Sequence, residues 1–307
     1  MAKEMFDLMI MIALLIMTGV LLKKKNIITD AGKKTLTDLI LRVILPCNIL
    51  RAFCIETGKN FWEAFSTMLF VAILVQILSM LAARFMYFRM KKGEKQVFQY
   101  GTVCSNAGFI GNPLTQSVFG DLGLLYASIY LIPLRIVMWT AGVAYFSDQA
   151  DKKQLMKKVL LNPCMIAVYI GMVLLVTQWA LPDAVMNTVT ALSNCCTAMT
   201  MLYIGTILAD VDVKLLLSAS QVYFALLRLV VLPTIVLSGC MLFQVDGLVS
   251  SVAVFLTAMP AGSTTSLLAS KYNADEEAAA KCVVFTTLLS VVTLAVWSFL
   301  LKSLYRL

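Results

Sequence analysis

Long runs of apolar residues, separated by short polar segments, follow one another along the whole chain. Ten such runs can be marked, at about 6–22, 36–53, 61–83, 96–119, 124–146, 159–179, 184–209, 215–240, 247–270 and 277–301. Most are long enough for an α-helix to cross about 30 Å of hydrocarbon, because each helical residue advances about 1.5 Å. The pattern predicts an all-α integral membrane protein with ten transmembrane helices.

The fourth run is interrupted near its middle by Gly108, Gly111 and Pro113. Proline has no N–H and disfavours a helical conformation in the residue before it, so the helix is expected to stop here. It is expected to restart with Asn112 as the N-cap and Pro113 at the first helical position. The first N–H groups of such a half-helix lack partners, and lipid offers none, so the break is expected to line a cavity or bind a ligand.

The ninth run contains a second break, at Pro260 and Gly262. Hydroxyl side chains surround it, at Thr257, Ser263, Thr264, Thr265 and Ser266. Interrupted apolar segments at corresponding positions of two halves are a sequence sign of the binding site of a secondary transporter. The alternative is a pair of ordinary proline kinks in two packed helices.

The order of the runs indicates an internal repeat. Residues 1–147 form a first five-helix repeat, 148–158 a short basic loop and 159–307 a second five-helix repeat. Because five is odd, the second repeat enters the membrane with the opposite orientation. We therefore expect two inverted repeats in which the broken fourth and ninth helices run antiparallel and cross near the membrane midplane.

Composition and charge support a membrane protein and predict its orientation. The chain is 60% apolar and 14% charged, which excludes an ordinary soluble domain. In a ten-span threading, seventeen Lys and Arg residues fall in the loops of one side and five on the other. The positive-inside rule then places the 148–158 loop in the cytoplasm and both termini outside. The net charge of +8 is explained by this topology, so nucleic-acid binding is not expected.

Two full charges lie deep in apolar runs, Arg135 in the fifth and Arg228 in the eighth, and no Asp or Glu does. A charge at such a depth costs at least about 2.5 to 3.5 kcal/mol on insertion scales. Either these residues line a polar cavity and attract an anion, or they bond backbone carbonyls freed near Pro133 and Pro233. The N-termini of half-helices also carry partial positive charge, so the electrostatic potential at the breaks favours a substrate that bears a carboxylate.

The candidate substrate-binding residues lie at the breaks and in neighbouring runs. They are Ser105, Asn106, Asn112, Pro113, Pro260, Thr264, Thr265, Asn48, Asn194, Arg135 and Arg228. Asn48 and Asn194 either face the same cavity or hydrogen-bond between helices. The eight cysteines show no metal-site spacing and the chain has no histidine, so no metal and no cofactor are expected. Nor is a set of nucleophile, base and orienting acid apparent, so an enzyme is not expected.

Several short motifs, in a fixed order, resemble a known family. They are Gly19 to Ile28 with its basic turn, Leu45-Pro46, the stretch 106–114, Ile204-Gly205, Met259-Pro260-Ala261, and Thr286 to Ser290 with Thr293 and Trp297. The chain resembles the auxin efflux carrier family, which includes plant auxin carriers and bacterial permeases described as malonate transporters. The resemblance implies a ten-helix inverted repeat with a crossover at two prolines, and a homodimer formed through a scaffold domain. The long cytoplasmic loop of many plant members is absent, so the chain is more similar to the bacterial short form of the inner membrane.

The residues and the resemblance together predict a secondary transporter, a permease for a small organic anion. It would work in the lipid bilayer by alternating access at the proline crossover. Two alternatives stay open: a sodium-coupled symporter of the bile-acid type, and a membrane receptor or enzyme that transports nothing.

Overall fold

A computed structural model describes residues 2–54, 61–88, 90–146, 157, 160–209 and 218–306. These residues form helices and no strand, which confirms the all-α prediction. The expected loop at 148–158 lies outside the described residues except for Lys157.

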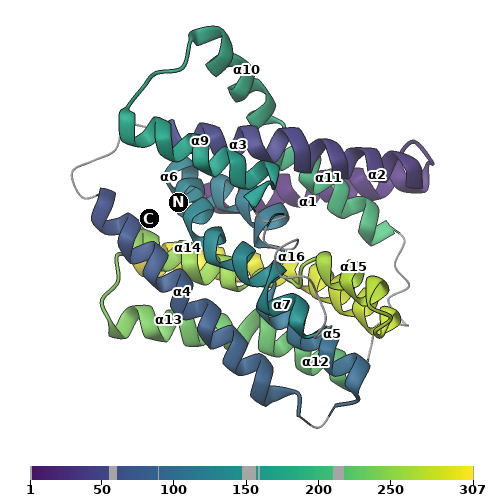
Figure 1. Ribbon diagram of the computed structural model, residues 1–307. Helices are drawn as coiled ribbons and strands as arrows, with labels where there is room; N and C mark the ends of the chain where they lie inside the picture. Colours follow the sequence, from purple (N-terminus) through teal and green to yellow (C-terminus); the bar gives the residue numbers. More distant parts are fainter. Residues whose placement is uncertain are drawn as a thin grey trace.

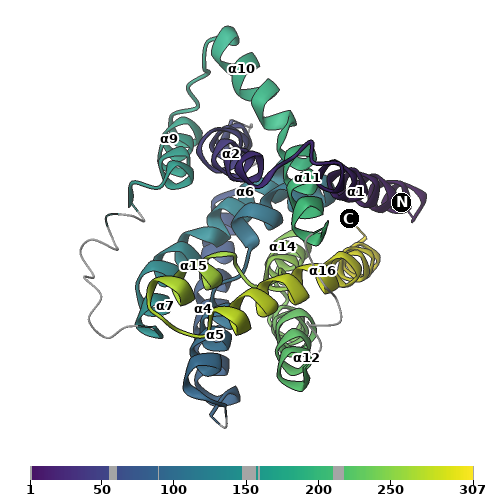
Figure 2. The same ribbon diagram turned by 90° about the vertical axis from the view of Figure 1, so that its right-hand side faces the viewer.

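The helices form two layers that run across the molecule (Figures 1 and 2). The first layer contains α1 (Ala2–Lys24), α2 (Asp30–Leu39), α3 (Leu45–Phe53), α9 (Pro163–Thr177), α10 (Asp183–Asn194) and α11 (Cys196–Ala209). In this layer α1 packs along α11, and α3 packs against both α9 and α10.

The second layer contains the two segments that the sequence predicts to be broken. It consists of α4 (Phe61–Met86), α5 (Lys92–Val103), α6 (Asn112–Trp139), α7 (Ala141–Ala144), α12 (Ala219–Leu226), α13 (Leu232–Leu242), α14 (Gly247–Thr257), α15 (Thr264–Lys271) and α16 (Glu276–Tyr305). Helix α6 packs on α4 and α14 of its own layer and also touches α3 and α11 of the first layer. It therefore forms much of the contact between the layers.

Among the residues that the structure describes, three short π-helical segments precede prolines. They are η1 (Ile40–Ile44), η2 (Ala107–Gly111) and η4 (Leu227–Val231), and one residue separates each from Pro46, Pro113 or Pro233. Proline cannot donate the helical hydrogen bond, and its ring clashes with the carbonyl four residues earlier. A wider π turn displaces that carbonyl, so the helix passes through the proline instead of ending at it.

Within the described parts of the chain, five stretches are long and apolar enough to cross a membrane. They are Trp62–Met86, Ala107–Ala144, Asp183–Ala209, Ala219–Leu242 and Glu276–Tyr305; Pro163–Thr177 and Gly247–Thr257 are shorter apolar helices. Ala107–Ala144 combines the second half of the fourth predicted run with the fifth run, through a kink at Gly120 where φ is +73°. Large apolar side chains such as Phe70, Phe85 and Val292 are exposed, as expected for residues that face lipid. The chain is a multi-pass membrane protein.

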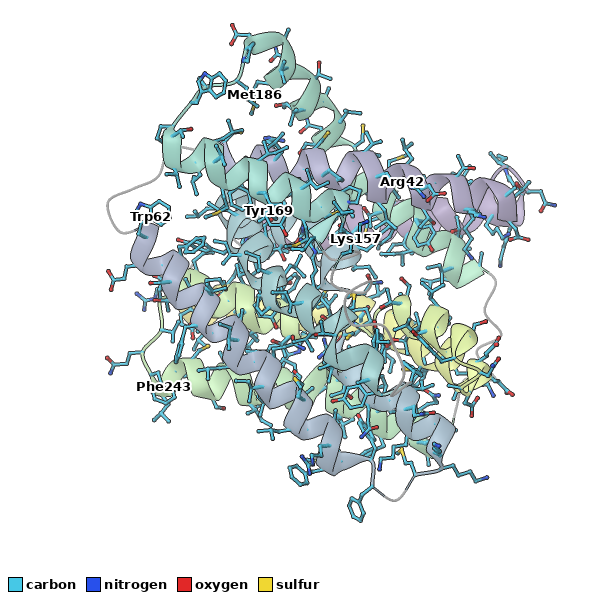
Figure 3. The ribbon with its side chains drawn as sticks, in the orientation of Figure 1. Arg42, Trp62, Lys157, Tyr169, Met186 and Phe243 are labelled. Atoms are coloured by element: carbon cyan, nitrogen blue, oxygen red, sulfur yellow. The ribbon has the colours of Figure 1, made fainter. Side chains whose placement is uncertain are left out.

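Both chain termini lie at the same end of the fold (Figures 1 and 2). Figure 3 places Trp62 and Phe243 toward that end, and both side chains are exposed. Exposed aromatic side chains at helix ends are typical of the boundary between lipid and water.

Candidate functional site

The two predicted breaks meet at the centre of the site. Helix α5 ends at Val103 and α14 ends at Thr257, and between the following segments Ser105 pairs with Ala261 in an isolated antiparallel bridge. The Asn106 N–H donates to the Pro260 carbonyl at 2.8 Å, and the Gly262 N–H donates to the Cys104 carbonyl at 2.9 Å. Each broken segment thus supplies hydrogen bonds that the other lacks, which is what a break inside a membrane needs.

The expected position of the helix restart is wrong. The second half-helix begins at Ala107 in η2, five residues before Asn112, and the Asn112 side chain caps nothing. Asn112 is fully buried, and neither its amide oxygen nor its nitrogen hydrogen-bonds to a described residue. The proline rule placed the restart too late because the bond to Pro260 ends α5 earlier and the π turn accommodates Pro113.

The last carbonyls of α5 also need partners, because the chain leaves the helix there. The amide of Gln76 donates to the Val103 carbonyl at 3.0 Å, and the Arg228 guanidinium donates to the Thr102 carbonyl at 3.2 Å. Arg228 is only 2% exposed, and its positive charge complements the negative end of the half-helix. These two side chains therefore act as caps of the first half-helix.

Beside the crossover lies a cavity of about 320 Å³ between the two layers. Ser105 and Asn106 line it from the first break, and Gly262, Ser263 and Thr264 line it from the second. Arg135 of α6 lines it as well, while Leu41, Leu45, Phe109, Met138, Tyr203, Ile204 and Leu267 form much of its apolar wall. The cavity lining is therefore polar where it meets the crossover and mainly apolar elsewhere.

Arg135 is the strongest electrostatic feature of this cavity. It is 8% exposed, and among the described residues no carboxylate forms an ion pair with it. Its Nη1 donates to the Met165 sulfur at 3.5 Å, and a thioether is only a weak acceptor. A Cβ placed on Gly108 would lie 3.9 Å from Nη2, so the guanidinium lies beside the start of the second half-helix. A buried charge with such a weak partner can bind an anion that enters the cavity.

Both half-helix N-termini add positive potential at the same place. Gly108 and Phe109 line the cavity at the start of η2, and Ser263 and Thr264 line it at the start of α15. The Tyr100 hydroxyl donates to the Thr264 hydroxyl oxygen at 3.0 Å, which leaves the Thr264 proton able to donate to a ligand. The first N–H groups of the two half-helices, a hydroxyl donor and a guanidinium together form an environment suited to an anion.

Comparison with known proteins now assigns the family. A family model described as "Membrane transport protein" matches residues 5–158 and 152–298. The chain belongs to this family. An uncharacterized transporter of Methanothermobacter thermautotrophicus is 22% identical over 298 residues, covering 94% of this chain and 96% of the relative. An uncharacterized transporter of Methanocaldococcus jannaschii is 21% identical over 309 residues, covering 96% and 98%.

Family membership confirms the resemblance found in the sequence and makes the chain a membrane transporter rather than an enzyme. The crossover of this transporter joins segments from the two stretches that the family model matches. The cavity beside it is thus built from both parts of the chain.

The structure separates the predicted site residues of the transporter into four groups. Ser105, Asn106, Thr264 and Arg135 line the cavity, whereas Asn112, Pro113, Pro260 and Thr265 lie at the crossover outside its lining. Asn48 and Asn194 hydrogen-bond between helices, which is the second of the two interpretations given above. Arg228 caps α5, and the carbonyl that Pro233 leaves free, that of Leu229, accepts from the Trp297 indole at 2.9 Å.

Sequence reasoning missed Gln76, which caps α5. The sequence did contain a signal, because Gln76 is a lone amide in the middle of a long apolar run. A polar side chain at such a depth needs a partner, and here the partner is a backbone carbonyl of the broken helix.

Proposed function

We propose that this transporter carries a small organic anion bearing a carboxylate, which binds beside Arg135. The observation that supports the proposal is the buried Arg135 guanidinium, which lines the cavity between two half-helix N-termini and, among the described residues, donates to the Met165 thioether. A carboxylate there would gain charge-assisted hydrogen bonds from the guanidinium, from Thr264 and from the first N–H groups of the half-helices. In the substrate-bound transporter, these hydrogen bonds would offset the free-energy cost of burying the Arg135 charge.

The proposed architecture is ten membrane-spanning helices arranged as two inverted five-helix repeats in the cell membrane. The broken segments 92–119 and 247–271, which meet at Ser105 and Ala261, would be the crossing fourth and ninth helices. The excess of basic residues near the cavity end of the fold supports a cytoplasmic opening and termini outside. Transport would follow alternating access, with the second layer moving against the first. By resemblance to the family, the first layer would form a homodimer interface.

Sodium coupling is the less favoured alternative. In other transporters the C-terminal end of a broken helix holds the coupling cation with its free carbonyls. In this chain the Thr102, Val103 and Cys104 carbonyls accept from Arg228, Gln76 and Gly262. The Arg228 guanidinium already occupies the place where a coupling cation would bind. We therefore propose that transport does not need sodium.

The cavity also favours one carboxylate over two. Among the described residues that line it, Arg135 alone carries a full charge, and most of the remaining wall is apolar. A second carboxylate would lose its hydration with no cation to pair with, which costs several kcal/mol. We therefore propose a monocarboxylate with an apolar body as the substrate class.

Thermal unfolding of the purified protein with candidate ligands tests this proposal. We expect monocarboxylates with apolar bodies to raise the melting temperature in a concentration-dependent way, because a ligand stabilises the state that it binds. The matching neutral amides should not do so, and dicarboxylates of similar size should act more weakly. Strongest stabilisation by dicarboxylates would overturn the single-carboxylate proposal, and stabilisation by none of the anions would overturn the anion proposal itself.

A further inference from the structure

A polar network joins the two layers at a place away from the cavity. The Asn48 amide donates to the Gln116 oxygen at 2.6 Å and to the Ser193 hydroxyl at 3.1 Å. Arg51 donates to the Asn194 oxygen at 2.7 Å and pairs with Asp121 at 3.3 Å. The network thus links α3 and α10 of the first layer to α6 of the second.

Asp121 is the centre of the network. One of its oxygens accepts from Arg51 and the other accepts from Gln116 at 2.7 Å. It follows Gly120, whose φ of +73° belongs to the left-handed region that a side-chain-bearing residue rarely adopts. The kink at Gly120 therefore sets the position from which Asp121 reaches Arg51.

The network begins about one helical turn beyond the cavity and extends away from it along the interlayer contact. Along residues 30–53, the cavity residues Leu41 and Leu45 come before Asn48 and Arg51. With a rise of about 1.5 Å per residue, the step from Leu41 to Arg51 spans roughly 15 Å.

Two other segments also separate the cavity from the network. Along the half-helix that starts at Ala107, Gly108 and Phe109 line the cavity, and Gln116 and Asp121 follow in the network. The network residues Ser193 and Asn194 lie at the C-terminal end of α10, and the cavity residues Tyr203, Ile204 and Ile207 follow in the second half of α11. In all three segments the cavity and the network are thus separated in a consistent direction.

The exposure of the side chains increases along the network from Asn48 to Asp121. This is expected if the network closes the transport path where it reaches water. The Arg51 and Asp121 side chains are 25% and 40% exposed, whereas Asn48 is fully buried. An ion pair that reaches water is worth only about 0 to 1 kcal/mol, so it can open and close at low cost. A dry apolar contact of the same extent would hold the layers together more firmly.

We propose that this network, formed by Asn48, Arg51, Gln116, Asp121, Ser193 and Asn194, is the latch that closes the transport path on the side away from the cavity. The inference rests on the proposed alternating access. The network holds α6 against α3 and α10 while the cavity is open, and its separation lets the layers part on the far side as the cavity closes.

Thiol labelling of the purified protein in lipid nanodiscs, where both faces are accessible, tests the latch. Two reporter cysteines are introduced singly, Thr197→Cys between the network and the cavity and Ile207→Cys in the cavity lining. The native Cys47, Cys54 and Cys195, and Cys164 of the cavity lining, are replaced by Ala. Asp121→Asn should speed labelling at position 197 about fivefold and slow it at position 207, because the lost ion pair shifts the balance between the two states.

Two further variants keep the test decisive. Exchange of the charges, Arg51→Asp with Asp121→Arg, should return both rates toward those of the wild type because it restores an ion pair. Arg42→Gln removes another exposed ion pair, with Asp38 four residues earlier on the same chain segment, and should change neither rate. Unchanged rates in a folded Asp121→Asn protein would overturn the latch, and faster labelling at both positions would show loosening instead of a change of state. The assay needs no substrate, so it is independent of whether the wild-type protein transports a carboxylate.

Discussion

Replacing Arg135 by Gln should weaken carboxylate binding by about thirtyfold or more while leaving the protein folded. Removing one partner of a buried charge pair typically costs about 2 kcal/mol or more, and about 1.4 kcal/mol is a factor of ten. Arg135→Lys should recover only part of the affinity, because an ammonium keeps the charge but lacks the planar pair of donors. Titration of ligand-induced thermal stabilisation measures these affinities.

Arg228→Gln is the matched comparison, because both arginines are buried in the same layer. Without ligand, Arg135→Gln should melt at the same temperature as the wild type or higher, since it removes a buried charge with no carboxylate partner among the described residues. Arg228→Gln should melt lower, since it disturbs the cap at the Thr102 carbonyl, at a cost of about 1 to 3 kcal/mol. Equal carboxylate affinity in wild type and Arg135→Gln would show that the anion binds elsewhere.

Gly205→Ala should prevent correct packing of the first layer. A Cβ on Gly205 would lie 2.1 Å from the Ile16 carbonyl oxygen and 2.8 Å from the Gly19 Cα, so the new methyl group would meet backbone that cannot turn aside. A Cβ on Gly19 would meet the Leu202 oxygen at 2.1 Å in the same crossing of α1 and α11. Small residues permit such close approach between membrane helices, and here their loss should separate the two helices.

The expected result for Gly205→Ala is a large fall in the yield and melting temperature of purified protein. Gly239→Ala is the control, because that glycine is also helical and a Cβ there would meet nothing within 4 Å. This control should be neutral or slightly stabilising, since alanine favours a helix over glycine by about 1 kcal/mol. Equal melting temperatures for the two variants would contradict the close crossing.

The sequence predicted where the chain would be interrupted because a proline or glycine deep in an apolar run conflicts with a regular helix. It therefore located both breaks and the polar residues Ser105, Asn106 and Thr264 that line the cavity. It misplaced the restart of the helix because the local effect of proline takes no account of hydrogen bonds to distant residues. The bond from Asn106 to Pro260 joins residues far apart in the chain, and the π turn before Pro113 compensates for the proline locally.

The roles of the two deep arginines could not be separated from sequence. Arg135 and Arg228 have similar apolar surroundings along the chain, and their difference depends on distant residues. Arg228 donates to a carbonyl at the end of α5, while Arg135 of α6 donates to the sulfur of Met165 in α9 of the first layer. The latch could not be predicted from sequence for the same reason. Asn48, Gln116 and Asn194 lie on three different helices, and only the folded structure brings their side chains together.

Uptake into sealed proteoliposomes tests the central claim most directly. The substrate is a labelled monocarboxylate chosen by thermal stabilisation, and wild-type protein is compared with Arg135→Gln and with protein-free liposomes, with and without sodium. We expect saturable uptake by the wild type, little uptake by Arg135→Gln, and no loss of uptake when sodium is replaced by choline. Dependence on sodium would contradict the proposed coupling, and a wild-type protein that binds the anion but gives no uptake above that of protein-free liposomes would contradict transport of a carboxylate through this cavity.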